Sequence, residues 1–447
     1  MVLEALGRAA GEDAPVGTAI TAAGSAVGSP TRVPVDRYTS RAFAARELER
    51  MWPRVWQIAC TVDHVSDPGD YYEYRVGPYS VVILRADDGA LRAYQNVCRH
   101  RGNQLCTGSG SGLTELRCGY HRWTWDLQGR LREVPSRKGF GALRNDDFGL
   151  FAASVDTWGP LVFVNLDPDA MPLAEYLEGV PADLAWIGFD DFRAEVLVTM
   201  PVAANWKVVA DGFSETYHVQ GLHREMIASM DDIDAPQRVW GHTSKSSQRY
   251  GVPSPRFRDG LDDQTVWDSF VLTQGARMGV TEVCPAPALA AGETLGDAIA
   301  AGIRSTQADK GVDLSRFDTD QMLTLHQYNL FPNATVLATP DLLSVLCAKP
   351  GADPDHAEMV AINFRRAPSA DAPRSQPFDV VLGAGEADLG FVLNADVSVA
   401  PAVQRGMHQP GLTHLALSSE ECRLINTHRN LERYLGIEPS ELTGGPA

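Results

Sequence analysis

The first 33 residues show no regular spacing of hydrophobic positions, and the spacing typical of a helix begins only after them. Residues 1–33 are rich in Ala, Gly, Ser and Thr and carry few large apolar side chains, so we expect a loose or weakly helical leader. From Arg41 to Trp56, the apolar residues Leu48, Met51 and Trp52 recur at helical spacing. This pattern predicts a helix that precedes the first strands.

Short apolar and alternating runs dominate residues 70–165 and predict β-strands joined by tight turns. Two of these runs flank Asp87-Asp88-Gly89, which is a hairpin signal. A second hairpin is expected at Gln128-Gly129, and Asp167-Pro168 marks the exit from this region. The strands expected are Tyr79–Arg85, Leu91–Tyr94, Trp123–Leu127, Arg130–Arg132 and Leu161–Leu166.

Beyond Pro201 the pattern mixes helix and strand. A helix is expected from Asn205, its N-cap, to His218, and another from Leu424 to Leu435. We expect two or three antiparallel strands to form the wall of a pocket. The candidate strands are Ala334–Ala338, Leu342–Leu346 and Met359–Phe364. The whole pattern predicts an α+β chain with an all-β region first.

A length of 447 residues predicts two or three domains. We place a leader at residues 1–40, an all-β domain at 41–168 and a mixed domain at 169–447. With 44% hydrophobic and 21% charged residues, the composition is ordinary for a globular protein. There is no internal repeat and no nucleotide-binding glycine motif, so any flavin or nicotinamide is expected on another polypeptide.

Composition also bears on location and partners. No apolar run approaches the length of a membrane helix, and the N-terminus lacks an export signal, so a cytoplasmic location is expected. The net charge of −18 makes non-specific nucleic-acid binding unfavourable. It permits an acidic docking face, although general solubility is the simpler interpretation. Five scattered cysteines are expected to be free thiols, as in a reducing compartment: Cys60, Cys106, Cys284, Cys347 and Cys422.

The remaining two cysteines belong to the most informative motif, Cys98-x-His100 followed by Cys118-x-x-His121. One Cys and one His in each of two loops can hold a [2Fe–2S] cluster, with two thiolates on one iron and two imidazoles on the other. That is the Rieske arrangement, which transfers single electrons. The alternatives are a zinc site with mixed ligands or buried structural residues, but structural zinc usually shows paired-cysteine knuckles.

A second constellation combines Glu215 with His218 and His223. Two histidines and a distant carboxylate can form the facial triad of non-haem iron oxygenases. Alone the motif is weak, because a helix with two ordinary histidines would look the same. Positions five apart on a regular helix point about 140° apart. The two histidines can therefore share a metal only if the helix ends or distorts between them, and Gly221 suits such a break. Glu215 and His218 are expected to share a helix face.

With these motifs and the stretch from Asn205 to His218, the chain resembles the α subunit of Rieske non-haem iron aromatic-ring-hydroxylating oxygenases. The resemblance runs from about residue 45 to the end. It implies an N-terminal all-β Rieske [2Fe–2S] domain and a C-terminal catalytic domain with an antiparallel sheet flanked by helices, of the helix-grip type. One departure is Arg122, where many relatives carry Gly after the second cluster histidine; a position that needs positive φ would strain an Arg.

The resemblance also implies roles for individual residues. The family takes its third iron ligand from a late helix, often before a Val-Gln-Arg-Gly stretch, and here Asp396 precedes Val403-Gln404-Arg405-Gly406. The rival acids are Asp388, Glu420 and Glu421. Glu215 maps onto the carboxylate that bridges to a cluster histidine of the neighbouring subunit. Many ring dioxygenases have Asp there, and the Glu resembles the branch with carnitine and betaine oxygenases, which leaves the substrate class open.

The implied function is the terminal oxygenase component of a multicomponent ring-hydroxylating dioxygenase. Its cofactors would be the [2Fe–2S] cluster at Cys98, His100, Cys118 and His121, and mononuclear Fe(II) at His218, His223 and Asp396. NAD(P)H would act only through a partner reductase or ferredoxin. The resemblance also implies a head-to-tail homotrimer, with β subunits allowed, acting on O₂ and a small aromatic substrate. The alternatives are a Rieske monooxygenase or demethylase, a quaternary-ammonium oxygenase, and, in another class, an electron-transfer Rieske protein with one metal centre.

Overall fold

β-Strands form the framework of both units into which the chain divides. The computed structural model describes residues 18–20, 30–386 and 388–438. The smaller unit consists of Arg46–Glu175 and Arg374–Pro377, and the other described residues form the larger unit. An all-β unit followed by a mixed unit confirms the predicted fold class.

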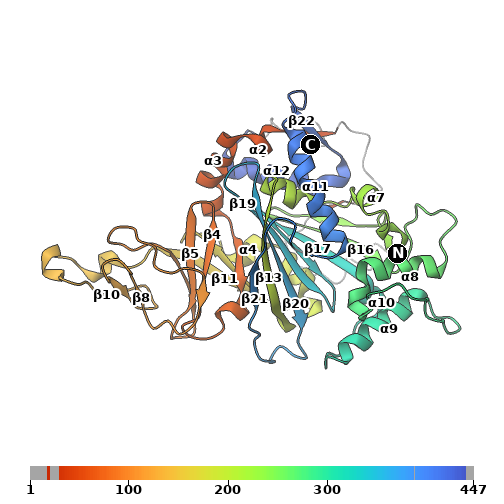
Figure 1. Ribbon diagram of the computed structural model, residues 1–447, viewed down its shortest axis with the longest axis horizontal. Helices are drawn as coiled ribbons and strands as arrows, with labels where there is room; N and C mark the ends of the chain where they lie inside the picture. The colour runs from red at the N-terminus through yellow and green to blue at the C-terminus, as the bar shows by residue number, and fades with distance from the viewer. Residues whose placement is uncertain (1–17, 21–29, 387, 439–447) are drawn as a thin grey trace. The chain divides into compact units, whose positions relative to one another are not determined.

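The smaller unit contains a seven-stranded sheet in the order β3-β12-β11-β6-β5-β4-β7 and a three-stranded sheet in the order β10-β9-β8. The hairpin predicted at Asp87-Asp88-Gly89 is confirmed, because β5 and β6 pair antiparallel on either side of it. Several strands of this unit are labelled in Figure 1. The bounds are β3 Gln57–Thr61, β4 Tyr71–Val76, β5 Tyr79–Arg85, β6 Leu91–Gln95, β7 Ser109–Gly110, β8 Leu116–Arg117, β9 Thr124–Trp125, β10 Leu131–Glu133, β11 Ala152–Trp158 and β12 Leu161–Asn165.

The predicted helix from Arg41 to Trp56 is too long at its end. Helix α3 covers Arg41–Arg50, and Trp52–Arg54 form a separate 3-10 turn, since Pro53 lacks the N–H that would continue an α-helix. Most of the predicted leader lies outside the described residues. Within it, Thr18–Ile20 form β1 and Thr31–Pro34 form β2, each paired with a distant strand. Strand structure there was not predicted, because the pairing partners are more than 200 residues away.

The larger unit is built on a ten-stranded sheet in the order β1-β15-β16-β17-β18-β19-β20-β13-β21, with β14 paired to β16. Its pairs are antiparallel except that β13 and β21 run parallel. A separate pair joins β2 to β22. The bounds are β13 Phe192–Val202, β14 Met230–Asp231, β15 Gln237–Val239, β16 Thr243–Tyr250, β17 Thr324–Leu330, β18 Ala334–Ala338, β19 Leu343–Pro350, β20 Ala357–Arg366, β21 Phe378–Val381 and β22 His414–Leu417.

The three candidate strands are confirmed as β18, β19 and β20, but the sheet also contains strands that the sequence pattern did not indicate. Strand β16 explains the shortfall. It buries Ser244, Ser246 and Gln248, which are polar and satisfied within the sheet and its surroundings, so its sequence carries no apolar alternation.

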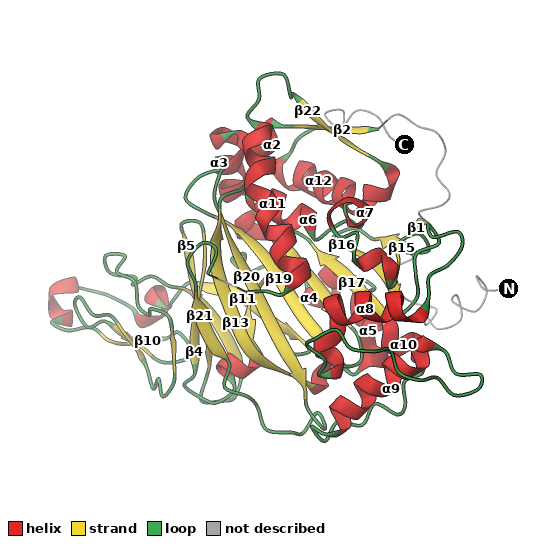
Figure 2. Cartoon of the chain, turned by 45° about the vertical axis from the view of Figure 1, so that its right-hand side comes forward, coloured by secondary structure: helices red, strands yellow, loops and turns green. Residues whose placement is uncertain are grey.

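Helices cover the larger sheet in two groups. Figure 2 shows α6, α7, α11 and α12 gathered along one side, with α8, α9 and α10 as a separate group. None of the helices in the described ranges combines the length and apolarity needed to cross a membrane. The bounds are α2 Asp36–Thr39, α4 Leu173–Leu177, α5 Val180–Leu184, α6 Trp206–Gly212, α7 Val219–Leu222, α8 Asp263–Gln274, α9 Leu295–Ala308, α10 Thr319–Leu323, α11 Phe391–Met407 and α12 Cys422–Leu435.

Candidate metal centres

Two loops of the smaller unit present the Cys–His motifs. The first loop follows β6 and is closed by hydrogen bonds from Cys98 N to Asn103 O at 2.8 Å and from Gly102 N to Cys98 O at 3.0 Å. The second loop joins β8 to β9, with Cys118 N donating to Trp123 O at 2.9 Å. Because short strands anchor both loops, their side chains are held by a β framework, as the sequence predicted.

These loops bring the four predicted cluster residues together. The thiol groups of Cys98 and Cys118 lie within hydrogen-bonding reach of each other, and both are buried. The rings of His100 and His121 have centroids 4.6 Å apart. His100 also stacks on Trp123, with centroids 5.2 Å apart. Two thiols beside two imidazoles are the donor set that a Rieske cluster requires.

Two observations fit a cluster in this position. Nδ1 of His100 is buried and, within the described part of the chain, accepts and donates no hydrogen bond, so this donor atom is available for a metal. Burial opposes ionisation of Cys118, but N–H groups of Tyr120 and His121 aim at its sulfur and lower its pKa. Cys98 keeps a raised pKa, mainly from burial, although N–H groups of the next residues also point to it. Such N–H groups stabilise thiolate ligands.

The second centre lies in the larger unit, where His218 and His223 flank the four-residue helix α7 as its N-cap and C-cap. Nε2 of His223 lies 2.7 Å from Oδ1 of Asp396, and Nε2 of His218 lies 3.5 Å from the same oxygen. One donor atom from each residue falls within 4.8 Å of the others. Two imidazoles and one carboxylate at this separation can bind a single divalent ion and leave coordination positions open.

The helix predicted from Asn205 to His218 is too long, but a helix does end between the two histidines as expected, at Leu222, directly after Gly221. Helix α6 begins after its N-cap Asn205, as predicted, but ends at Gly212. Gly221 lies within α7. The chain leaves the helix at Phe213, whose carbonyl accepts hydrogen bonds from Gln327 and from Asn329 of β17, the latter at 2.9 Å. These tertiary bonds replace the helical ones and turn both histidines toward one point.

The structure separates Asp396 from its three rivals. Asp396 lies on α11 with a side chain that is 7% exposed, against the two histidines. Asp388 is exposed and accepts from Gly390 N at 3.0 Å, before α11 begins. Glu421 accepts from Ser418 N at 2.7 Å as part of a capping box. Among the described residues, Glu420 and Glu421 do not join the three-residue group.

Glu215 contacts His218 rather than the metal position. Its Oε1 lies 2.6 Å from Nδ1 of His218, and its Oε2 accepts from the His218 backbone N–H at 3.0 Å. Burial opposes the charged imidazole, but this bond and the charge of Glu215 raise the pKa of His218. The contact directs Nε2 of His218 toward Asp396, which is how a carboxylate orients a metal-binding histidine. Glu215 lies between α6 and α7, so the expected shared helix face is replaced by a bend.

A buried network that sequence patterns did not reveal supports these helices. The Tyr38 hydroxyl donates to Asp211 of α6 at 2.6 Å and lies 2.8 Å from Nε2 of His428 on α12. Burial, as the main cause, raises the pKa of Asp211 to about 7. Asn205 donates to the Tyr38 carbonyl at 2.9 Å. No local signal could have linked Tyr38 to residues more than 160 positions away.

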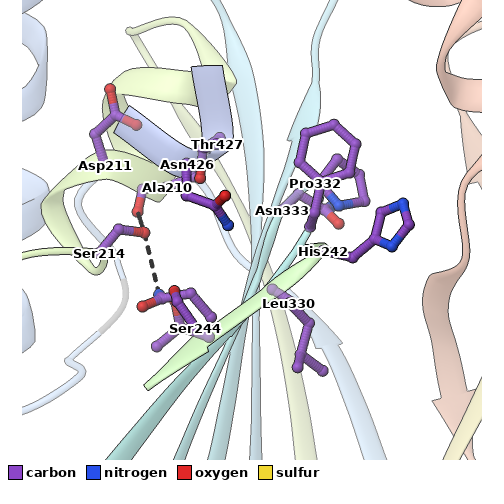
Figure 3. A pocket seen from close by; sticks show the side chains of 14 residues that line it. Ala210, Asp211, Ser214, His242, Ser244, Leu330, Pro332, Asn333, Asn426 and Thr427 are labelled. Atoms are coloured by element: carbon purple, nitrogen blue, oxygen red, sulfur yellow. Dashed lines mark hydrogen bonds between the residues drawn. The ribbon is translucent and has the colours of Figure 1, made fainter. Parts of the chain in front are cut away.

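Two cavities adjoin α6. One of about 230 Å³ reaches His218, Asp396 and Glu215 and is lined mainly by aliphatic side chains of α6, α11 and α12, with Phe213 as its one aromatic ring among the described residues. The other, of about 10 Å³, has room for about one water molecule. Figure 3 shows this smaller, polar pocket, with Ser214 just after α6. The Asn329 side chain donates to Ser214 at 3.1 Å. This hydrogen bond holds the chain where it leaves α6, and the pocket itself is too small for a substrate.

Comparisons with known families follow the same division of the chain. The family described as Rieske [2Fe-2S] domain matches residues 55–150, and the family described as ring hydroxylating alpha subunit (catalytic domain) matches residues 189–437. The second match alone covers more than half of the chain.

Curated relatives include enzymes named for different substrates. The glycine betaine monooxygenase oxygenase subunit of Pseudomonas aeruginosa is 27% identical over 46% of this chain and 48% of that protein. The carnitine monooxygenase oxygenase subunit of Escherichia coli is 28% identical over 52% of this chain and 63% of that protein. The biphenyl 2,3-dioxygenase subunit alpha of Rhodococcus jostii is 30% identical over 40% and 41%, respectively. The chain thus spans about half the length of the curated relatives it matches.

Solved structures match over more of the chain. A quaternary ammonium Rieske monooxygenase superposes with a TM-score of 0.66 at 18% identity, covering 91% of this chain and 96% of that one. Naphthalene 1,2-dioxygenase with indole bound superposes with a TM-score of 0.63 at 17% identity, covering 94% and 96%. At these identities the likeness establishes the fold.

Proposed function

Because the chain belongs to the family of ring-hydroxylating oxygenase α subunits and also contains a Rieske domain, we propose that it is the terminal oxygenase of a multicomponent system that hydroxylates a small aromatic substrate. O₂ and electrons from NAD(P)H, through a separate reductase or ferredoxin, are its co-substrates. The observation that carries this proposal is the presence, in one chain, of a four-residue Cys–His site and a two-His-one-carboxylate site. An electron carrier needs only the first.

The chain's own residues hold and orient the two centres. When bound, a Rieske cluster supplies one-electron transfer and a mononuclear iron supplies O₂ activation. Cys98, Cys118, His100 and His121 form the first binding site. At the second, Glu215 orients His218, and the carboxylate of Asp396 lies close to Nε2 of both histidines.

The surroundings of the second site support an uncharged, apolar substrate. Val219, Met226 and Met230 flank His223 along the chain and belong to a buried hydrophobic cluster with Trp267 and Phe270. The cavity that reaches His218 is mainly aliphatic, and its single ring falls short of the several ring faces that bind a quaternary ammonium group.

A quaternary-ammonium substrate is the second candidate, and two observations favour it. Two of the relatives are named for glycine betaine and for carnitine. Glu215 also stands where many ring dioxygenases have Asp. The product decides between the candidates, because the metal ligands would be the same.

We further propose a head-to-tail homotrimer, with or without β subunits, in which Glu215 links one subunit's iron site to the neighbour's cluster site. Exposure of Glu215 to a cavity that opens between helices supports this role. A closed ring of heterologous contacts is a common symmetry. A cytoplasmic location is proposed as well, and the lack of disulfide bonds between the cysteines of the described residues supports it.

Metal content and product analysis test the proposal together. The oxygenase should hold about three irons per chain, whereas an electron-transfer Rieske protein would hold about two. Purified protein, supplied with a generic reductase and NADH, should convert arenes to products heavier by one or two oxygen atoms from ¹⁸O₂. Two irons per chain and no labelled product from arenes, betaines or carnitine would contradict the proposal. Label only in betaine or carnitine products would select the second candidate.

A further inference from the structure

Arg122 occupies a backbone conformation that strains it. Its φ is 59°, in the left-handed region that only glycine adopts freely. It directly follows His121, and its N–H donates to the Cys118 carbonyl at 3.0 Å, so the loop requires this conformation. Strain retained beside a functional site indicates that the side chain has a use there.

The Arg122 side chain has no polar partner in the described part of its own subunit. It is exposed, and no hydrogen bond or ion pair of its guanidinium occurs among the residues that the structure describes. Exposed rings lie around the cluster site. Tyr120 is 57% exposed beneath the Arg101 guanidinium, and Phe140 is 42% exposed beside the His100 ring. We name Arg101, Tyr120, Arg122 and Phe140 the cluster face.

This combination of residues is typical of a protein-binding surface. Aromatic side chains and arginines are enriched at the centres of protein interfaces. The charge around the cluster face also differs from that of the chain. Between Cys98 and Leu150, nine side chains are basic and five acidic, whereas the whole chain carries −18. The cluster face therefore fits an acidic partner, opposite in sign to the acidic docking face considered from the sequence.

The second metal site carries a surface of complementary character. Tyr217, between Glu215 and His218, is 51% exposed, and Val399 and Val403 are 41% and 39% exposed at the rim of the 230 Å³ cavity. Glu420 and Glu421 lie just before α12. Burial raises the pKa of Glu421, and the negative charges of Glu215 and Glu420 raise it further, so the three carboxylates form one acidic group. We name these residues, with Glu215, the iron face.

Two basic residues near the iron face, Arg423 and Lys207, are buried and do not contribute to its surface charge. Arg423 is buried and donates to Gln237 at 3.0 Å and to Asn329 at 2.8 Å. Lys207 is fully buried against aromatic rings. Both point into the unit, whereas Glu420 is partly exposed. The iron face thus presents an apolar centre with an acidic edge, and the cluster face an aromatic centre with a basic edge.

We propose that Arg122 is a docking residue between copies of this chain, which pairs with the Glu420–Glu421 carboxylates of the next subunit. The inference rests on the proposed head-to-tail trimer and adds to it the contact that selects the partner face. Complementary charge and apolar centres on two faces of one chain favour a second copy over a separate protein. We expect the pairing to bring the partly exposed His121 toward the neighbour's Glu215.

Charge reversal in the full-length, metal-loaded protein tests the pairing. We expect Arg122→Glu and Glu420→Lys each to weaken subunit association about tenfold or more in sedimentation velocity, and to slow reoxidation of the reduced cluster by O₂ and substrate. The double variant Arg122→Glu/Glu420→Lys should recover most of both losses. Arg54→Glu, the same charge change at an exposed site in the smaller unit, is the matched control and should behave as wild type.

A glycine variant separates docking from local structure. Arg122→Gly removes the strain and the charge together, so it should keep the cluster's paramagnetic resonance spectrum and melt no lower than wild type, yet associate more weakly. Wild-type association and reoxidation in Arg122→Glu would overturn the inference. If Arg122→Glu instead raises the KM for the electron donor and leaves subunit association unchanged, the inference would also be overturned, because the cluster face would then bind the donor. A wild-type protein that is no trimer would instead overturn the proposed assembly.

Discussion

At the scale of single residues, Asp396 contributes the oxygen that lies within 3.5 Å of both histidines. We expect Asp396→Ala to remove about one iron per chain and all oxygenation, because two imidazoles alone hold Fe(II) weakly. The Rieske spectrum should remain. Iron analysis with paramagnetic resonance of the reduced protein provides the measurement.

Asp388→Ala is the matched control for this prediction, since Asp388 was a rival ligand and lies eight residues earlier. Its carboxylate accepts hydrogen bonds before α11 and is fully exposed. Full iron content in Asp396→Ala, or loss of iron in Asp388→Ala alone, would show that another acid is the ligand.

Single residues also show the reach of sequence reasoning. Cys98, His100, Cys118 and His121 were recognisable because their spacing within two loops is itself the chemical signal. Arg122 was recognisable as a departure from the family pattern, and the structure gives it a positive φ of 59°. The role of Tyr38 could not be recognised from the sequence, because its hydrogen bond to Asp211 joins positions 173 residues apart.

At the scale of elements, the start of α6 depends on Asn205. Its side chain accepts from Lys207 N at 3.0 Å and donates to the carbonyls of Tyr38 at 2.9 Å and Pro354 at 2.8 Å. We expect Asn205→Ala to lower the free energy of unfolding by about 2–4 kcal/mol, from the lost cap and the lost hydrogen bonds to two buried carbonyls. Urea denaturation followed by circular dichroism measures this.

Asn205→Ser separates the two contributions, because serine keeps a capping oxygen but reaches neither carbonyl with an amide. It should lose less stability than the alanine variant. Equal losses in the two variants would mean that the cap itself contributes nothing.

Another element-level contact, between α5 and the sheet, predicts a pH dependence. Asp183 accepts from Lys245 at 2.6 Å and from Tyr328 at 2.8 Å. Burial opposes its charge, but Lys245 and these bonds lower its pKa below the ordinary 3.8. A depressed folded-state pKa contributes stability that is present above pH 3.8 and is lost as the pH falls through the folded-state value.

We therefore expect Asp183→Asn to be less stable than wild type by about 1–3 kcal/mol at pH 7. The difference should shrink as the pH falls below about 4, because wild type then loses the same charge. Urea midpoints across this range give the measurement, with exposed Asp259→Asn as control. A difference that stays constant down to pH 3 would contradict the assignment.

At the scale of the whole molecule, Glu215 is expected to separate metal binding from electron transfer between subunits. Glu215→Gln should leave both sites loaded and the cluster reducible, but slow its reoxidation in single-turnover experiments with substrate and O₂. The amide lacks the charge-assisted bond that a carboxylate makes with an imidazole N–H. Glu225→Gln, an exposed glutamate after the same motif, is the control. Wild-type reoxidation in the Gln variant would remove the bridging role.

The sequence by itself determined what depends on neighbours along the chain. The cluster motif, the histidine pair, the Asn205 cap and the strands from Ala334 to Phe364 all carry local signals of spacing or alternation. Only the tertiary structure decided the rest. Bonds from Gln327 and Asn329 to Phe213 end α6 early and bring both histidines to one point. The resemblance favoured Asp396 over three rival acids, but only the fold brings its carboxylate within 2.7 Å of His223, 173 residues earlier in the chain. The polar strand β16 joins a ten-stranded sheet because its backbone pairs with β15 and β17, and β17 comes from a distant part of the sequence. Contacts between distant segments have no periodicity, so sequence patterns cannot reveal them.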